Sequence, residues 1–111
     1  MEAYRGTVNQ LIEKSIMQDF YVYILLCKDN SYYVGHTDNL DQRISDHSVG
    51  QGCLYTKQRL PIKLVFVESV QSRQQAFELE RQIKNWSRAK KEALINEDWE
   101  KLKLLAKKKF G

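Results

Sequence analysis

The sequence predicts an α+β domain in which a three-stranded antiparallel sheet is flanked by helices. Three segments are rich in aromatic and β-branched residues, and four segments space their apolar residues as helices do. Their order is β-β-α-β-α-α followed by a C-terminal helix. The 111 residues are 42% hydrophobic and 29% charged, which suits one domain with a small core. This composition excludes a disordered chain, a collagen-like repeat and a multidomain enzyme.

The first two predicted strands form a hairpin. Residues 20–27 are apolar on both faces, which is typical of a buried strand. Residues 28–31 carry turn-forming side chains, and residues 32–36 are expected to form the returning strand. A third strand is predicted at residues 62–68, directly after Pro61.

Four helices are indicated by side chains that can cap a first turn and by apolar residues at helical spacing. Asparagine and serine oxygens at such positions accept hydrogen bonds from free N–H groups. Gly50 and Gly52 break the chain after the first of these helices. The predicted helices are residues 40–48 capped by Asn39, 73 to about 86 capped by Ser72, 88–95 capped by Ser87, and about 97–109 capped by Asn96.

The chain is expected to divide into three regions. Residues 1–18 form an N-terminal extension in which Thr7 can cap a short helix. Residues 19–95 hold the strands and most of the helices, and residues 96–111 form a basic C-terminal helix.

The distribution of charge points to a polyanionic partner. The net charge is +4, but residues 81–111 contain ten basic and four acidic residues, so the excess lies at the C-terminal end. Such asymmetry predicts nucleic acid as the partner first and an anionic membrane surface second. A solvated basic helix without a partner is the alternative interpretation.

The sequence favours a cytoplasmic protein without a membrane span. The longest unbroken apolar run covers the eight residues 20–27, whereas a spanning helix needs about 20. Residues 1–18 lack the apolar centre of a secretory signal. Two cysteines cannot build a disulfide framework. We expect a monomer or a weak dimer.

Two polar residues interrupt the apolar stripe of the helix that follows Asn39. Leu40, Arg43, Ile44 and His47 fall within an arc of about 100° on a helical wheel. Either polar residue alone is most simply a boundary residue at the edge of the core. The pair together is less easily explained in that way.

Glu80 lies beside the apolar stripe of the helix that follows Ser72, between Ala76 and Phe77 on the wheel. A carboxylate there costs several kcal/mol to bury unless it meets a cation, hydrogen-bond donors or a metal. One interpretation is a structural ion pair with Arg43. The other is a metal ligand opposite a phosphate-binding arginine.

The predicted hairpin is crowded with tyrosines, and Gly35 follows Tyr33 by two positions. Glycine inside a strand often marks a close approach of backbone or ligand. Tyr23 and Tyr33 can share one face of the sheet only if the hairpin loop has an odd length or contains a bulge. A site shared by the two phenols would therefore require one of these features around residues 28–31.

Together these residues resemble the GIY-YIG nuclease domain. Its two characteristic tripeptides correspond to Val22-Tyr23-Ile24 and Tyr33-Val34-Gly35. Arg43, His47 and Glu80 follow in the order that the family shows. Residues 80–91 and the following Leu94-Ile95 resemble the tail of the small stand-alone bacterial members, and the resemblance covers about residues 20–95.

The resemblance implies a metal-dependent endonuclease that hydrolyses DNA and selects structure rather than sequence. It implies that Glu80 holds Mg²⁺ or Mn²⁺ and that Arg43 pairs with the phosphate. Tyr23 positions or deprotonates the attacking water, Tyr33 supports it, and His47 is a second candidate base. The residues expected to contact DNA are Gly35, His36, Lys84, Arg88, Lys90 and Lys91. A nucleic-acid-binding module without catalysis, and a nuclease that acts only with a partner in DNA repair, are the alternatives.

Overall fold

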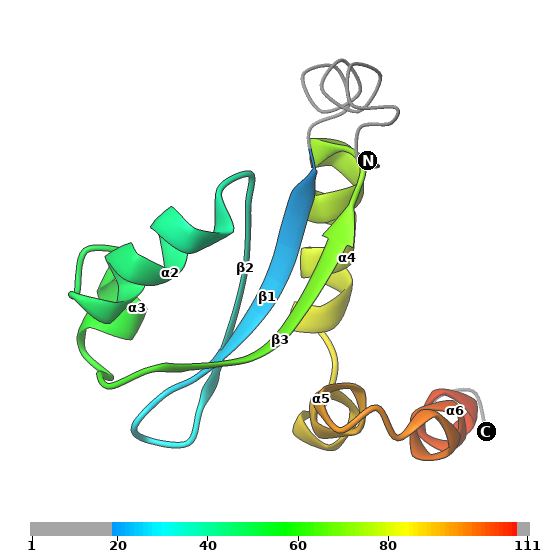
Figure 1. Cartoon of the computed structure of the whole chain (residues 1–111). Coiled ribbons are helices and arrows are strands. Elements are labelled where there is room, and N and C mark those ends of the chain that lie inside the picture. Colours follow the sequence, from blue (N-terminus) through cyan, green and yellow to red (C-terminus); the bar gives the residue numbers. More distant parts are fainter. Residues whose placement is uncertain (1–18, 109–111) are drawn as a thin grey trace, which may run out of the picture.

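The sheet has the order β2-β1-β3 and is antiparallel throughout, which confirms the predicted α+β class. The computed structural model describes residues 19–108 (Figure 1). Its strands are β1 (Phe20–Leu26), β2 (Tyr32–Thr37) and β3 (Lys63–Val70). The short helix expected after Thr7 lies outside the described residues.

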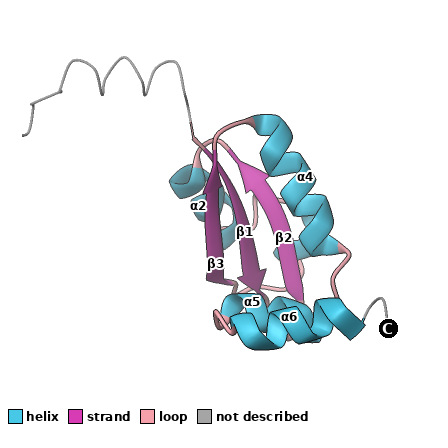
Figure 2. Ribbon diagram, turned by 90° about the vertical axis from the view of Figure 1, so that its right-hand side faces the viewer, coloured by secondary structure: helices cyan, strands magenta, loops and turns pink. Residues whose placement is uncertain are grey.

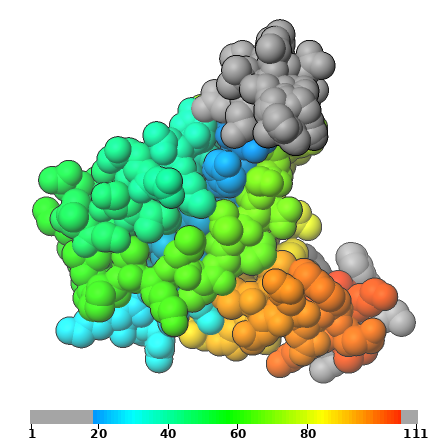
Figure 3. Space-filling view, viewed as in Figure 1, coloured from blue at the N-terminus to red at the C-terminus, as the bar shows by residue number. Residues whose placement is uncertain are grey.

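The two faces of the sheet are covered by different helices. α2 (Leu40–Ser48) and α3 (Leu54–Lys57) lie on one side, and α4 (Arg73–Lys84) lies on the other (Figure 1). α5 (Arg88–Ile95) and α6 (Trp99–Lys108) lie across one end of the strands (Figure 2). Figure 3 shows that these last two helices form a lobe at that end of the molecule.

The main core lies between the sheet and α4. Even-numbered residues of β1 and β2 point to this side because side chains alternate along a strand. They pack against the apolar stripe of α4 and against the end of α5. The buried members of this core are Val22, Ile24, Val34, Ala76, Ile83 and Leu94.

The hairpin loop has an odd length, as predicted. Leu26 pairs with Tyr32, and the Cys27 N–H donates to the Ser31 carbonyl at 2.9 Å. The loop proper is therefore residues 28–30, and Asn30 takes the left-handed conformation with φ 69°. In this register Tyr23 and Tyr33 point to the same face of the sheet, toward α2 and α3.

Helix boundaries differ from the predictions at three places. The sequence did not reveal α3, because four residues are too few to show helical spacing. α4 ends at Lys84, before the expected residue 86. α6 begins at Trp99 because Asn96 ends α5 and Glu97 has a positive φ of 55°. The Lys101 N–H accordingly bonds to the Asp98 carboxylate.

No helix within residues 19–108 is long and apolar enough to cross a bilayer.

Replacing Ile83 by alanine should destabilise the core strongly. Ile83 lies on the face of α4 that packs against the sheet and is 1% exposed. We expect Ile83→Ala to lower the free energy of unfolding by about 2–5 kcal/mol, measured by urea denaturation. Leu104→Ala is the control, because this leucine is 61% exposed and should change stability by less than about 0.5 kcal/mol. Equal losses in both variants would contradict this assignment of the core.

Candidate active site

The ring of Tyr23 lies across Gly35, its cross-strand partner on β2. A Cβ atom at position 35 would stand 2.5 Å from the Tyr23 hydroxyl oxygen and 2.7 Å from the adjacent ring carbon. Such an approach is closer than a side chain tolerates, so a residue without a side chain is required here. Gly35 therefore creates the space that Tyr23 occupies, and its expected contact with DNA stays a prediction.

A buried chain of hydrogen bonds continues from the Tyr23 hydroxyl. Its oxygen lies 2.9 Å from His47 Nε2 on α2, and His47 Nδ1 lies 2.8 Å from the Thr56 hydroxyl on α3. His47 and Thr56 are both 0% exposed. Gly52 makes room for the imidazole ring, because a Cβ atom at that position would overlap it.

Tyr33 and Arg43 complete this side of the site and are its partly exposed members. The Tyr33 ring centroid lies 6.5 Å from that of Tyr23 and 5.3 Å from that of His47. Arg43 lies one turn before His47 on α2. Hydrogen bonding to Tyr23 raises the pKa of the Arg43 guanidinium, which keeps its positive charge next to the phenol.

Burial controls the protonation of these groups. It raises the pKa of the Tyr23 phenol, while Arg43 lowers that pKa and the Glu80 carboxylate adds a smaller increase. Burial also raises the pKa of Tyr33. Burial and then the Arg43 charge lower the pKa of His47. The site therefore holds protonated phenols, a neutral imidazole and a charged guanidinium at neutral pH.

Glu80 approaches from α4, on the opposite side of the sheet. Its carboxylate pairs with His36 Nδ1 of β2 and lies 2.7 Å from Lys84 Nζ one turn along the helix. The structural ion pair with Arg43 that the sequence allowed is therefore not formed. Burial raises the pKa of Glu80, but hydrogen bonds from His36 and Lys84 outweigh it and leave the pKa below its usual value.

The carboxylate of Glu80 suits a weakly held hard cation. Its side chain is 13% exposed, so it is reachable from solvent. No cluster of three or more His, Cys, Asp or Glu residues in the described part of the chain is placed to hold a metal. Mg²⁺ binds through one or two carboxylates and keeps water and phosphate oxygens as its other ligands. One accessible carboxylate therefore meets the minimum for Mg²⁺ or Mn²⁺ with substrate present.

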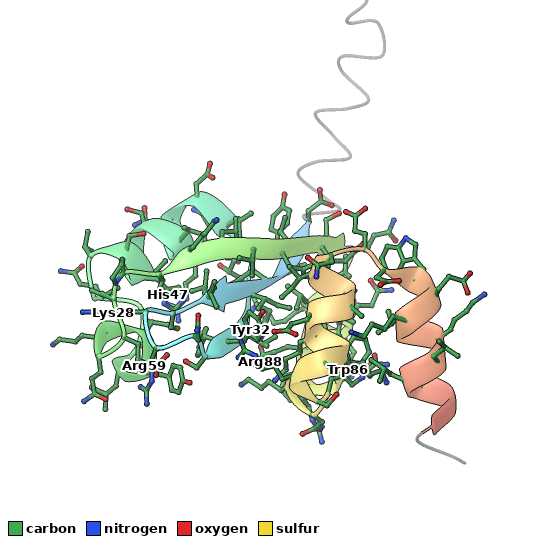
Figure 4. All side chains as sticks on the ribbon, turned by 90° about the horizontal axis from the view of Figure 1, so that it is seen from below. Lys28, Tyr32, His47, Arg59, Trp86 and Arg88 are labelled. Carbon is green, nitrogen blue, oxygen red and sulfur yellow. The ribbon has the colours of Figure 1, made fainter. Side chains whose placement is uncertain are left out.

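The basic residues expected to contact DNA have different surroundings. Arg88 donates to the Asn30 carbonyl and to Glu92, and it covers the Tyr32 ring (Figure 4). Lys90 lies 4.4 Å from the centre of the Trp86 ring. Burial lowers the pKa of Lys91, and the charge of Arg88 lowers it further. Arg88 thus links α5 to the hairpin, whereas Lys90 is partly exposed and lies over the Trp86 ring.

Sequence reasoning missed two structural contributors to the site. Thr56 and Gly52 lie in a segment that showed only chain-breaking glycines and no helical spacing. Phe77, which the helical wheel places at the edge of the apolar stripe of α4, is 45% exposed. Its ring instead stands beside His36 and Arg81 at the surface.

Comparison with known proteins finds one family model and several similar proteins. A family model described as the GIY-YIG catalytic domain matches residues 19–93. The UPF0213 protein SH2523 of Staphylococcus haemolyticus is 46% identical over 81 residues, which cover 73% of this chain and 99% of that protein. The UPF0213 protein YazA of Bacillus subtilis is 42% identical over 77 residues, 69% of this chain and 78% of that protein. A solution NMR structure of the UPF0213 protein BH0048 from Bacillus halodurans matches with 44% identity and a TM-score of 0.48, covering 70% of this chain and 83% of that one.

His47 should make stability depend on pH. Because burial lowers its pKa from the model-compound value of 6.5, the unfolded chain binds this proton more readily than the folded chain. The contribution of His47 is complete above the unfolded pKa and is lost as the pH falls through the folded pKa. We expect the free energy of unfolding to decrease between about pH 7.5 and about pH 5.5, with a smaller decrease in His47→Gln. Urea denaturation across this range measures both, and equal slopes would contradict the prediction.

Proposed function

The chain belongs to the GIY-YIG nuclease family, and on that basis we propose that it is a divalent-metal-dependent endonuclease that hydrolyses phosphodiester bonds in DNA. One observation supports this proposal above the others. The Tyr23 phenol is hydrogen-bonded to His47 and next to the Arg43 cation, and the Glu80 carboxylate on α4 adds slightly to the pKa of that phenol. Hydrolysis of a phosphodiester needs these kinds of group together.

Arg43 is the group proposed to hold the phosphate. Its guanidinium remains charged, is partly exposed, and presents paired N–H donors that match two phosphate oxygens. In the free protein these donors face the Tyr23 phenol. Binding of a phosphate beside Tyr23 would therefore use a cation that is already in position.

Glu80 is the residue proposed to hold Mg²⁺ or Mn²⁺. When bound, the ion would neutralise charge that develops on the phosphate group. Lys84 and His36 orient the carboxylate through its two oxygens. Because Lys84 is half exposed, its ammonium group can leave Glu80 without disturbing the core.

Tyr23 is favoured over His47 as the group that contacts the attacking water. Both side chains are buried, with Tyr23 1% and His47 0% exposed, but the Tyr23 hydroxyl lies between His47 Nε2 and the partly exposed Arg43. A water molecule beside the phosphate would therefore meet the phenol first. This arrangement supports a direct role for Tyr23 and an indirect one for His47.

The basic residues of α5 and α6 support selection by DNA structure rather than by sequence. Lysines there can contact backbone phosphates, which are the same for every base pair. A branched or otherwise distorted DNA is the proposed substrate, in a cytoplasmic repair process in which a protein partner can supply targeting.

Glu80→Gln should abolish most cleavage. The amide keeps the size of the side chain but removes the charge that would hold the metal, so we expect cleavage to fall about 10²- to 10³-fold. The assay uses a four-way junction and a linear duplex, each with Mg²⁺ or EDTA. Glu78→Gln is the matched control, because Glu78 lies on the same helix as Glu80. Within residues 19–108, the side chain of Glu78 is hydrogen-bonded only to Gln74.

Cleavage that depends on Mg²⁺ and on Glu80, but not on Glu78, would support the proposal. Binding of DNA without cleavage in any condition would instead support a binding module. Cleavage that is equal in EDTA and in Mg²⁺ would contradict the metal-dependent mechanism.

Lys90→Ala should weaken DNA binding in a salt-dependent manner. If its ammonium group contacts one phosphate, the slope of log K against log salt concentration becomes less negative by about 0.9. Fluorescence anisotropy with a labelled duplex in EDTA measures this slope. Lys63→Ala, at the exposed start of β3, is the control. The same slope change in both variants would exclude a specific contact by α5.

A further inference from the structure

Thr56 stands at the end of the hydrogen-bond chain that begins at Tyr23. Three elements supply its members: Tyr23 comes from β1, His47 from α2 and Thr56 from α3. The two links measure 2.9 Å and 2.8 Å, which is normal for hydrogen bonds. Neither the family resemblance nor the proposed mechanism gives Thr56 a role.

The direction of this chain follows from the groups at its two ends. The Thr56 hydroxyl donates to the Cys53 carbonyl at 3.3 Å, so its oxygen is left to accept from His47 Nδ1–H. The Cys53 thiol, 3.5 Å from the same oxygen, is a weak partner. At the other end Tyr23 neighbours Arg43, which can only donate. The phenol proton of Tyr23 is therefore directed at His47 Nε2, which must carry a lone pair.

Resting on the proposed nuclease function, we propose that Thr56 is a positioning residue that holds His47 in its Nδ1–H tautomer, so that Tyr23 can pass its proton to Nε2 during hydrolysis. The water oxygen forms a bond to phosphorus while one water proton moves to the Tyr23 oxygen. The original phenol proton moves to His47, and the bond from phosphorus to the leaving oxygen breaks. That oxygen takes a proton from solvent, and His47 later returns its proton to Tyr23, which releases one to solvent.

The surroundings of His47 make this proton transfer reversible. The charged and titratable groups around the imidazole are Arg43 and Asp46 on its own helix and the phenols of Tyr23 and Tyr33. The Cys53 thiol lies 3.5 Å from the Thr56 hydroxyl to which the imidazole bonds. Burial and the Arg43 charge disfavour the imidazolium, and these effects lower the pKa of His47. The proton is thus held only briefly. A tyrosine with a raised pKa becomes an effective base in this way, because it loses one proton as it gains another.

The tautomer of His47 tests the proposal without any cleavage assay. Long-range ¹H–¹⁵N NMR spectra distinguish protonation at Nδ1 from protonation at Nε2. We expect the Nδ1–H form in the wild type and in Thr56→Ser, and a shift toward the Nε2–H form in Thr56→Val. Nε2–H in the wild type, or an unchanged tautomer in Thr56→Val, would overturn the proposal. If Thr56→Val fails to fold, Tyr23→Phe replaces it, and retention of the Nδ1–H form there shows that Thr56 sets the tautomer; its loss shows the opposite.

Activity provides the second readout. We expect Thr56→Val to lower kcat about 10- to 100-fold with little change in KM, and Thr56→Ser to restore most of it, as found when supporting hydrogen bonds are removed from other sites. Equal activity of the valine and serine variants would contradict the proposal. Absence of cleavage by the wild type would instead count against the nuclease function, while the tautomer measurement would still judge the role of Thr56.

Discussion

The close packing of the Tyr23 ring over Gly35 is the constraint on which the candidate site depends. A hydrogen atom in place of a side chain at position 35 leaves space for a phenol that would otherwise be excluded. The Tyr23 hydroxyl then meets both His47 and Arg43, which are one turn apart on α2. The arginine and histidine that interrupt the apolar stripe of α2 are explained by this phenol, since each of them is a polar partner for it.

The site draws its groups from both faces of the sheet. The phenols, the guanidinium and the imidazole come from the side of α2 and α3, whereas Glu80 comes from α4. In the proposed mechanism these groups would act together around β2, which is an edge strand of the sheet. The Glu80 charge makes only a small contribution to the pKa of Tyr23, which is raised mainly by burial. His36, on the α4 side of β2, holds that carboxylate near the edge.

Local patterns in the sequence were sufficient for most of the fold. The hairpin and the bounds of α2 and α5 could be predicted because strand alternation, capping residues and turn chemistry act within a few positions. The odd loop followed from the expectation that Tyr23 and Tyr33 share a site. The partner of Glu80 on the sheet could not be predicted in this way. The pair with Lys84 is a local i,i+4 contact within α4, but whether the carboxylate also meets Arg43 or His36 depends on how α4 is placed against the sheet, which no local pattern encodes. Thr56 was missed for a similar reason, because its hydroxyl gains importance only through a histidine on another helix.

The three-residue turn between β1 and β2 keeps the pairing of the two strands in one register. A slip of this pairing by one position would move Tyr33 to the side of α4 and would turn Val34 out of the core. Residues added within the turn would only lengthen the loop and can leave the strand pairs unchanged. The turn can therefore vary in length, whereas the alignment of β1 with β2 cannot.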